Sequence, residues 1–179
     1  MSFDREKLKT LALYIIWRVG DVRDFGAIKL NKILWFCDAR SYEAYGKSIT
    51  GAIYIRRKFG PVPKDIEPVL DELSQSGMIR TWNEPYFDVA VKRFAAHAPP
   101  DVSAFSADEL GLIDWWIKHV VEDHTAATIS EKSHDYGWKI ANEGEELPLK
   151  AFLAKRIREP RTPDELEWAQ STARQLAVK

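Results

Sequence analysis

The sequence predicts an α+β domain that is mostly helical, with a compact helical core and a small antiparallel sheet. Apolar residues recur at helical spacing in several segments, and short segments of alternating polarity lie between those helices. Hydrophobic residues make up 45% of the 179 residues, which is enough to build one large core. A chain of this length suits a single domain, with room for a short appendage.

Two helices are expected in the first 46 residues. Residues 8–19 form one apolar stripe, and Gly20 ends that helix. The second helix should run from about Ala27 to Tyr45, and its middle is apolar on every side. Such a helix is buried on most faces, so we expect it to be the central element of the core and to bury Cys37.

The middle of the chain predicts a winged-helix-like layout. A strand is expected over Gly51 to Phe59, followed by a third helix that starts near Lys64 with Pro68 in its first turn. Two further strands, residues 78–82 and 86–94, should be joined around Asn83-Glu84-Pro85. Helix and ribbon together resemble a winged helix, and a DNA-binding transcriptional regulator is therefore one functional hypothesis. The acidic third helix argues against it, because phosphates would repel that helix.

The last third of the chain predicts more helices. A capping box at Ser106 to Glu109 should open a fourth helix. Residues 126–133 should form a short fifth helix. The stretch from residue 134 to 149 reads as irregular and acidic. A second capping box, Thr162 to Glu165, predicts a final helix. We therefore expect a domain over residues 1–154 and a C-terminal helical extension over residues 155–179.

Composition and charge limit the location and the partners. There is one Cys, the N-terminus is polar, and no apolar run approaches the roughly 20 residues of a membrane helix, so a cytoplasmic protein without membrane contact is expected. Residues 1–64 hold 13 Lys and Arg against 6 Asp and Glu, whereas residues 65–179 hold 13 against 21. Either one pole of the surface attracts an acidic partner or nucleic acid, or folding mixes these charges in space.

No assembled catalytic or metal site is apparent, and we expect neither enzyme activity nor a cofactor. His119 and His124 are five positions apart, which does not place them on one helix face, so a zinc site is not expected. Ser133, His134 and Asp135 are consecutive and cannot adopt the geometry of a catalytic triad. A hydrolase with an unrecognised site is the third and weakest hypothesis.

Three strings resemble one known family. The segment Lys29–Asp38 (KLNKILWFCD) is similar to the K-L-Q-K-L-L-Y-F-A helix of the Panacea domain, found in SocA-like antitoxins and in phage-associated proteins. Residues 58–62 (KFGPV) resemble its Y-G-P-V turn, and residues 129–138 resemble its later L-S, T-H and W stretch. The resemblance covers roughly residues 8–153, and the substitutions at Asn31, Trp35 and Phe59 preserve size and character.

The resemblance implies a cytoplasmic antitoxin of a type II-like system. Such a protein neutralises a toxin encoded by a neighbouring gene through direct protein contact and needs no cofactor; the identity of the toxin and the oligomeric state do not follow from it. We interpret the motif residues as structural rather than as partner contacts. They are Lys29, Leu30, Asn31, Lys32, Trp35, Phe36, Gly60, Pro61, Ser133, His134 and Trp138.

The predicted strand over residues 51–59 is the candidate partner surface. If Ile53 and Ile55 face inward, the alternation of a strand places Tyr54, Arg56 and Lys58 outside. Arg57 and Phe59 would point inward but lie near the strand end, where the turn can expose them. The predicted partner contacts are Tyr54, Arg56, Arg57 and Lys58. The competing interpretation is that Arg56 and Arg57 pair with the acidic third helix.

Overall fold

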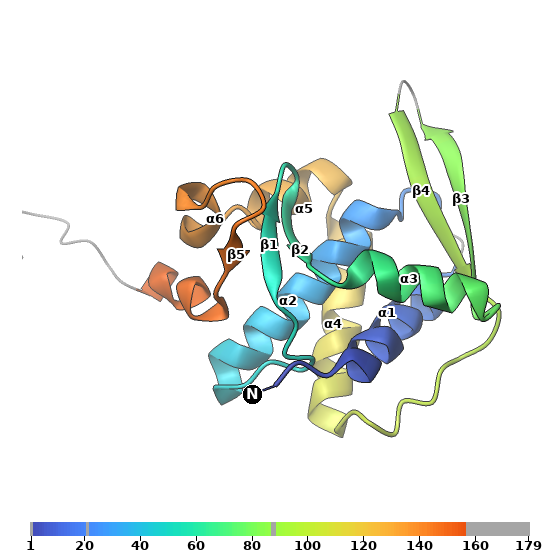
Figure 1. The fold of residues 1–179 in the computed structure, drawn as a ribbon, viewed down its shortest axis with the longest axis horizontal. Helices are drawn as coiled ribbons and strands as arrows, with labels where there is room; N and C mark the ends of the chain where they lie inside the picture. Colours follow the sequence, from blue (N-terminus) through green and yellow to red (C-terminus); the bar gives the residue numbers. More distant parts are fainter. Residues whose placement is uncertain (1, 21, 87–88, 157–179) are drawn as a thin grey trace, which may run out of the picture.

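The structure, a computed structural model, describes residues 2–20, 22–86 and 89–156 (Figure 1). Its helices are α1 (Arg5–Val19), α2 (Ala27–Tyr45), α3 (Ile66–Gln75), α4 (Ala107–Asp123), α5 (Ala126–Lys132), α6 (Tyr136–Ile140) and the 3-10 helix η1 (Leu149–Arg156). Its strands are β1 (Tyr54–Arg57), β2 (Gly60–Pro63), β3 (Ile79–Tyr86), β4 (Val89–Ala96) and β5 (Glu146–Leu147). The prediction of a mostly helical α+β fold is confirmed. None of the helices in these ranges is long and apolar enough to span a membrane.

Helix α2 lies at the centre of the fold, as its apolar sequence predicts. It packs against α1, α4, α5, η1 and β2, so nearly all of its surface is covered. Phe36 stacks on Trp116 of α4 with ring centroids 4.4 Å apart, and Trp35 meets Tyr54 of β1 edge-on at 4.9 Å. Cys37 has no accessible surface, which confirms its predicted burial, and burial raises the pKa of its thiol.

Strand β1 is the middle strand of an antiparallel sheet of order β2-β1-β5. The expectation of irregular chain over residues 134–149 is wrong in two places, because α6 and β5 lie there. Helix α6 is opened by Asp135, whose side chain accepts a hydrogen bond from the Trp138 backbone N–H, and β5 pairs Leu147 with Tyr54. Elements of five and two residues are too short to show a period in the sequence.

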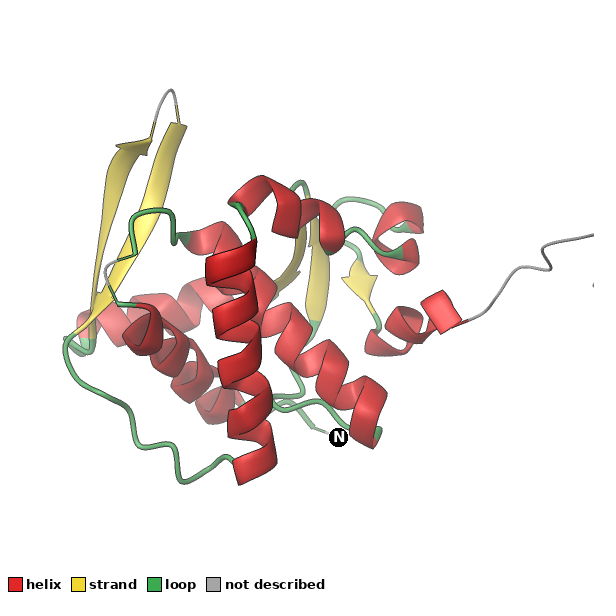
Figure 2. Ribbon diagram, turned by 180° about the vertical axis from the view of Figure 1, so that it is seen from behind, coloured by secondary structure: helices red, strands yellow, loops and turns green. Residues whose placement is uncertain are grey.

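Strands β3 and β4 form a separate two-stranded ribbon that stands at the end of the molecule opposite α6 and η1 (Figures 1 and 2). The predicted turn at residues 83–85 is wrong: Asn83 pairs with Lys92 and Pro85 with Ala90 inside the ribbon. A proline is tolerated there because each strand of a two-stranded ribbon has one edge without a partner strand, where a missing N–H costs little. The order of helix and ribbon matches the winged layout.

Several predicted helix boundaries are confirmed. Ser106 and Glu109 form the expected capping box of α4, and Pro68 lies in the first turn of α3. Helix η1 continues to Arg156, and the proposed boundary between residues 154 and 155 stays a prediction. The final helix, predicted to start at the capping box Thr162 to Glu165, lies outside the described residues.

Candidate interaction site

The three strings that resemble the Panacea domain meet in space. Helix α2 supplies Lys32, the β1–β2 hairpin supplies Gly60 and Pro61, and the α5–α6 region supplies Ser133 and Trp138. We call these residues together with His134 the motif cluster. Sequence reasoning placed these strings along the chain but gave no reason for their contact in the fold.

Lys32 is the centre of the motif cluster. Its side chain is buried, and its ammonium donates a hydrogen bond to the Pro61 carbonyl at 2.9 Å. No carboxylate pairs with it within the described ranges, and burial lowers the pKa of Lys32 to about 7. A buried amine without a carboxylate partner costs stability, because charging it requires removing an ion from water.

Gly60 makes this approach possible. Its φ of 107° favours glycine, and a Cβ atom there would lie 2.3 Å from Ser133 Oγ and 2.7 Å from Lys32 Nζ. The Ser133 hydroxyl in turn donates to the Ser130 carbonyl at 2.6 Å. The glycine of the turn motif is therefore required both by its backbone conformation and by the close contact of hairpin, α2 and α5.

A second layer of contacts ties the hairpin to α6. His134 stacks on Trp138 with ring centroids 3.6 Å apart, and the guanidinium of Arg56 lies 4.4 Å from the Trp138 ring centroid. Arg56 Nε donates to the Trp138 carbonyl at 3.2 Å, and Trp138 Nε1 donates to the Arg57 carbonyl at 3.0 Å. Burial, followed by the charges of Lys32 and Arg56, lowers the pKa of His134. This arrangement fixes the end of β1 next to the turn of the hairpin.

The outward orientation expected for Tyr54 is wrong. Its side chain is 1% exposed, and its hydroxyl donates to the buried carboxylate of Asp38 on α2 at 2.8 Å. Ile53 is 42% exposed instead, while Ile55 is buried. The alternation argument assumed one solvent-exposed face. Tyr54 instead packs on Trp35 and Asp38 of α2, and Ile55 on the opposite face is also buried, so both faces of β1 are covered here.

We expect Tyr54→Phe to lower the free energy of unfolding by about 1–3 kcal/mol, because the buried Asp38 carboxylate loses one of its donors. Urea denaturation measures this effect, and Tyr45→Phe is the control because Tyr45 is 57% exposed. Equal stability of the two variants would contradict the buried hydrogen bond.

The cationic residues of the hairpin divide into two groups. Arg56 is held by Trp138 and pairs with Glu143 at 3.0 Å, and Arg57 lies 3.8 Å from the same carboxylate. The pairing of both arginines with the third helix is therefore wrong; the partner lies after α6. Lys58 makes no ion pair within the described ranges, and Phe59 is 52% exposed. We call Arg57, Lys58 and Phe59 the hairpin tip.

Beside the hairpin tip lies a hollow of about 250 Å³. Ala27, Ile28 and Asn31 line it from the first turns of α2, and Phe59 and Val62 line it from the hairpin. Lys32, Arg57, Lys58 and Glu143 complete its wall. We call it the α2 hollow.

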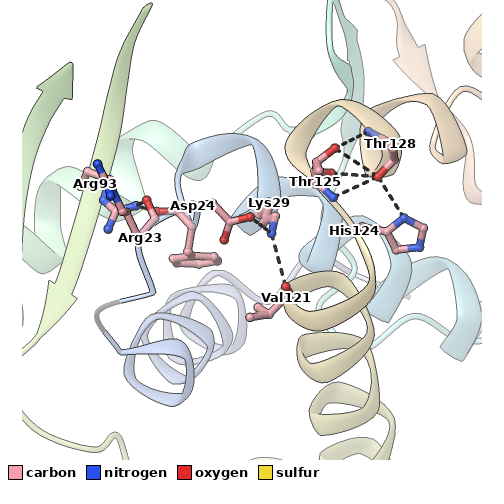
Figure 3. A network of polar contacts seen from close by, with 9 residues as sticks. Arg23, Asp24, Lys29, Arg93, Val121, His124, Thr125 and Thr128 are labelled. Carbon is pink, nitrogen blue, oxygen red and sulfur yellow. Dashed lines mark hydrogen bonds and ion pairs between the residues drawn. The ribbon is translucent and has the colours of Figure 1, made fainter. Parts of the chain in front are cut away.

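The start of α2 is anchored by polar contacts away from this hollow. The Lys29 ammonium, which is buried, pairs with Asp24 at 2.7 Å and lies 3.5 Å from the Val121 carbonyl at the end of α4 (Figure 3). Arg93 of β4 donates to the carbonyls of Arg23 and Phe25. These contacts, in which Lys29 takes part, hold α2 against both α4 and the ribbon.

The two histidines of the α4–α5 corner lie together, contrary to the expectation from their spacing. His124 is the C-cap of α4 with an extended backbone, so its ring turns back, and its Nε2 lies 3.3 Å from His119 Nε2. Lys132 Nζ lies 2.7 Å from the same His119 atom. The described part of the chain has no group of three or more His, Cys, Asp or Glu side chains that could hold a metal ion.

Charges from the two halves of the sequence are mixed at several points of the surface. Arg5 of α1 pairs with Glu72 of α3 at 2.6 Å, and Lys7 pairs with Glu109 of α4 at 2.9 Å. These ion pairs therefore neutralise part of the positive charge of residues 1–64. The positive charge of the hairpin tip is less neutralised, because Glu143 is the one acidic residue among those that line the adjoining α2 hollow.

The model of the family described as "Antitoxin SocA-like, Panacea domain" matches residues 30–139, about three fifths of the chain. The match includes the whole motif cluster and the hairpin. No curated protein and no solved structure gives a significant match.

Proposed function

The chain belongs to the SocA-like Panacea antitoxin family, and we propose that it neutralises a toxin encoded by a neighbouring gene through direct, stoichiometric protein binding. The observation that carries this proposal is the hairpin tip. It presents an aromatic ring and two cations on a base fixed by the motif cluster. Rigid aromatic and cationic anchors are typical of binding hot spots.

The surface of α3 supports this function over DNA binding. Its exposed face carries Glu67, Asp71 and Glu72, and no Lys or Arg lies on the helix. Two of these carboxylates pair with Lys92 and Arg5 from other elements, which leaves no cationic face for a phosphate backbone. The winged layout therefore supplies architecture without the charge that a recognition helix needs.

The test is expression of the adjacent gene with and without this protein. We expect the adjacent gene alone to stop growth, co-expression to restore it, and the two products to copurify. Restored growth should depend on the amount of this protein, because binding is stoichiometric. Growth arrest that co-expression leaves unchanged, for the genes on both sides, would refute the proposal.

The contribution of the hairpin tip is tested by Arg57→Glu with Lys58→Glu. Both residues are exposed, so we expect an unchanged melting temperature and at least a tenfold loss of affinity for the toxin, because like charges now meet an acidic partner. Lys47→Glu with Lys118→Glu changes the net charge equally at exposed positions elsewhere and should keep wild-type affinity. Equal affinity of both double variants would exclude this surface as the interface.

A further inference from the structure

We propose that the α2 hollow binds one apolar side chain of an acidic segment of the partner protein, whose carboxylates pair with Arg57 and Lys58. This inference rests on the proposed function, since it specifies the chemistry by which the same surface recognises its partner. It concerns the hollow itself, which the growth experiment does not examine.

The size of the hollow selects the kind of occupant. Its volume of about 250 Å³ equals roughly eight water molecules at about 30 Å³ each. Pockets for drug-sized molecules typically hold about 300–1,000 Å³, so this hollow suits a single large side chain better than a whole small molecule. A shallow hollow that takes one anchor side chain is characteristic of protein recognition.

The walls select an apolar anchor. Ala27 and Ile28 of α2 and Val62 of β2 face the hollow with aliphatic groups, and the half-exposed Phe59 ring forms one side. An aliphatic or aromatic side chain placed there would remove its own surface and part of these walls from water. Phe59 would then lose the solvent exposure that is unfavourable for an aromatic ring.

The positive charge at the rim favours acidic residues next to that apolar side chain in the partner segment. Arg57 and Lys58 flank the opening, and Glu143 offsets only one positive charge. Helix α2 adds to this field, because its N-cap Gly26 gives no side-chain hydrogen bond and its first turn has no acidic residue. Carboxylates of an occupant segment are therefore stabilised on both sides of the hollow.

Asn31 supplies a polar group for the backbone of the occupant. Its Oδ1 atom is buried and has no hydrogen-bond partner within the described ranges, although Asn31 lines the hollow. A buried acceptor without a donor is unfavourable, and rotation of the Asn31 side chain toward the hollow would let a backbone N–H of an extended segment satisfy it. An acidic segment with an apolar residue thus meets the three kinds of group that the site presents.

The test uses a phage-displayed library of random peptides and the full-length protein. We expect enrichment of peptides with an apolar residue next to Asp or Glu, and we measure the affinity of the best peptide by fluorescence anisotropy. Ala27→Leu narrows the hollow and should weaken binding at least tenfold. Ala44→Leu makes the same change at an exposed site near the other end of α2, about 25 Å away, and should have no effect.

Enrichment of peptides without acidic residues, or an affinity of Ala27→Leu within twofold of wild type, would overturn the inference. Phe59→Ala removes a wall from an exposed position and replaces Ala27→Leu if that variant does not fold. The result is separable from the proposed function. Peptide binding without growth rescue by the wild-type protein would reject the antitoxin role alone, whereas rescue by Ala27→Leu at wild-type level would reject the hollow alone.

Discussion

Replacing Leu34 by Ala should lower the free energy of unfolding by about 2–5 kcal/mol, because the truncated side chain leaves a cavity at the centre of the core. Leu34 has no accessible surface and lies midway along α2, the helix that α1, α4, α5 and η1 surround. Close packing on several sides prevents the neighbours from collapsing into the space, which favours the upper half of this range.

The measurement is urea denaturation followed by tryptophan fluorescence, with the slope of the transition checked against wild type. Met78→Ala is the control, since Met78 is 49% exposed and its loss should cost less than about 0.5 kcal/mol. A loss below 1 kcal/mol for Leu34→Ala would show that α2 is not the central element of the core.

The central role of α2 could be predicted because one physical rule decides it. An amphipathic helix needs water on one side, and the segment around Leu34 offers no polar side. Capping boxes are equally local, since Ser106 and Glu109 satisfy each other's backbone within one turn. Features that depend on a few neighbouring residues can be inferred without knowing the fold.

The candidate site depends on contacts that are distant along the chain. The inward orientation of Tyr54 is decided by its contacts with Asp38 and Trp35 of α2, which lie sixteen and nineteen positions earlier. The contact between His119 and His124 is decided by the extended backbone of His124 itself, which ends α4. Neither the alternation of polarity nor the spacing in a regular helix contains this information.

The contacts within the motif cluster could not be predicted from the sequence either. Its strings can be recognised one by one, yet the close approach of Gly60 to Lys32 and Ser133 follows only from the packing of three elements. The sequence indicates a structural role for these residues without predicting their contact. The structure adds the physical cost that one of them imposes, which is the burial of an amine.

That cost makes stability depend on pH in a direction that can be tested. The pKa of Lys32 falls from 10.5 to about 7 in the folded protein because the ammonium is removed from water. In the unfolded chain Lys32 keeps its proton up to about pH 10.5, so between pH 7 and 10.5 the unfolded state binds more protons than the folded state. Stability due to Lys32 must therefore rise with pH across this window and stay constant below pH 7.

Lys32→Met is the variant that isolates this effect, because methionine fills the same space without a titrating group. Between pH 7 and 9.5 the wild type should gain on the order of 3 kcal/mol relative to Lys32→Met, as each unit of the pKa difference corresponds to about 1.4 kcal/mol. Taking the difference between the two proteins cancels the other titrating groups, and the lost bond to the Pro61 carbonyl shifts the variant equally at both pH values. Parallel stability curves across this window would show that Lys32 keeps its charge in the folded protein, held by a partner that compensates for its burial.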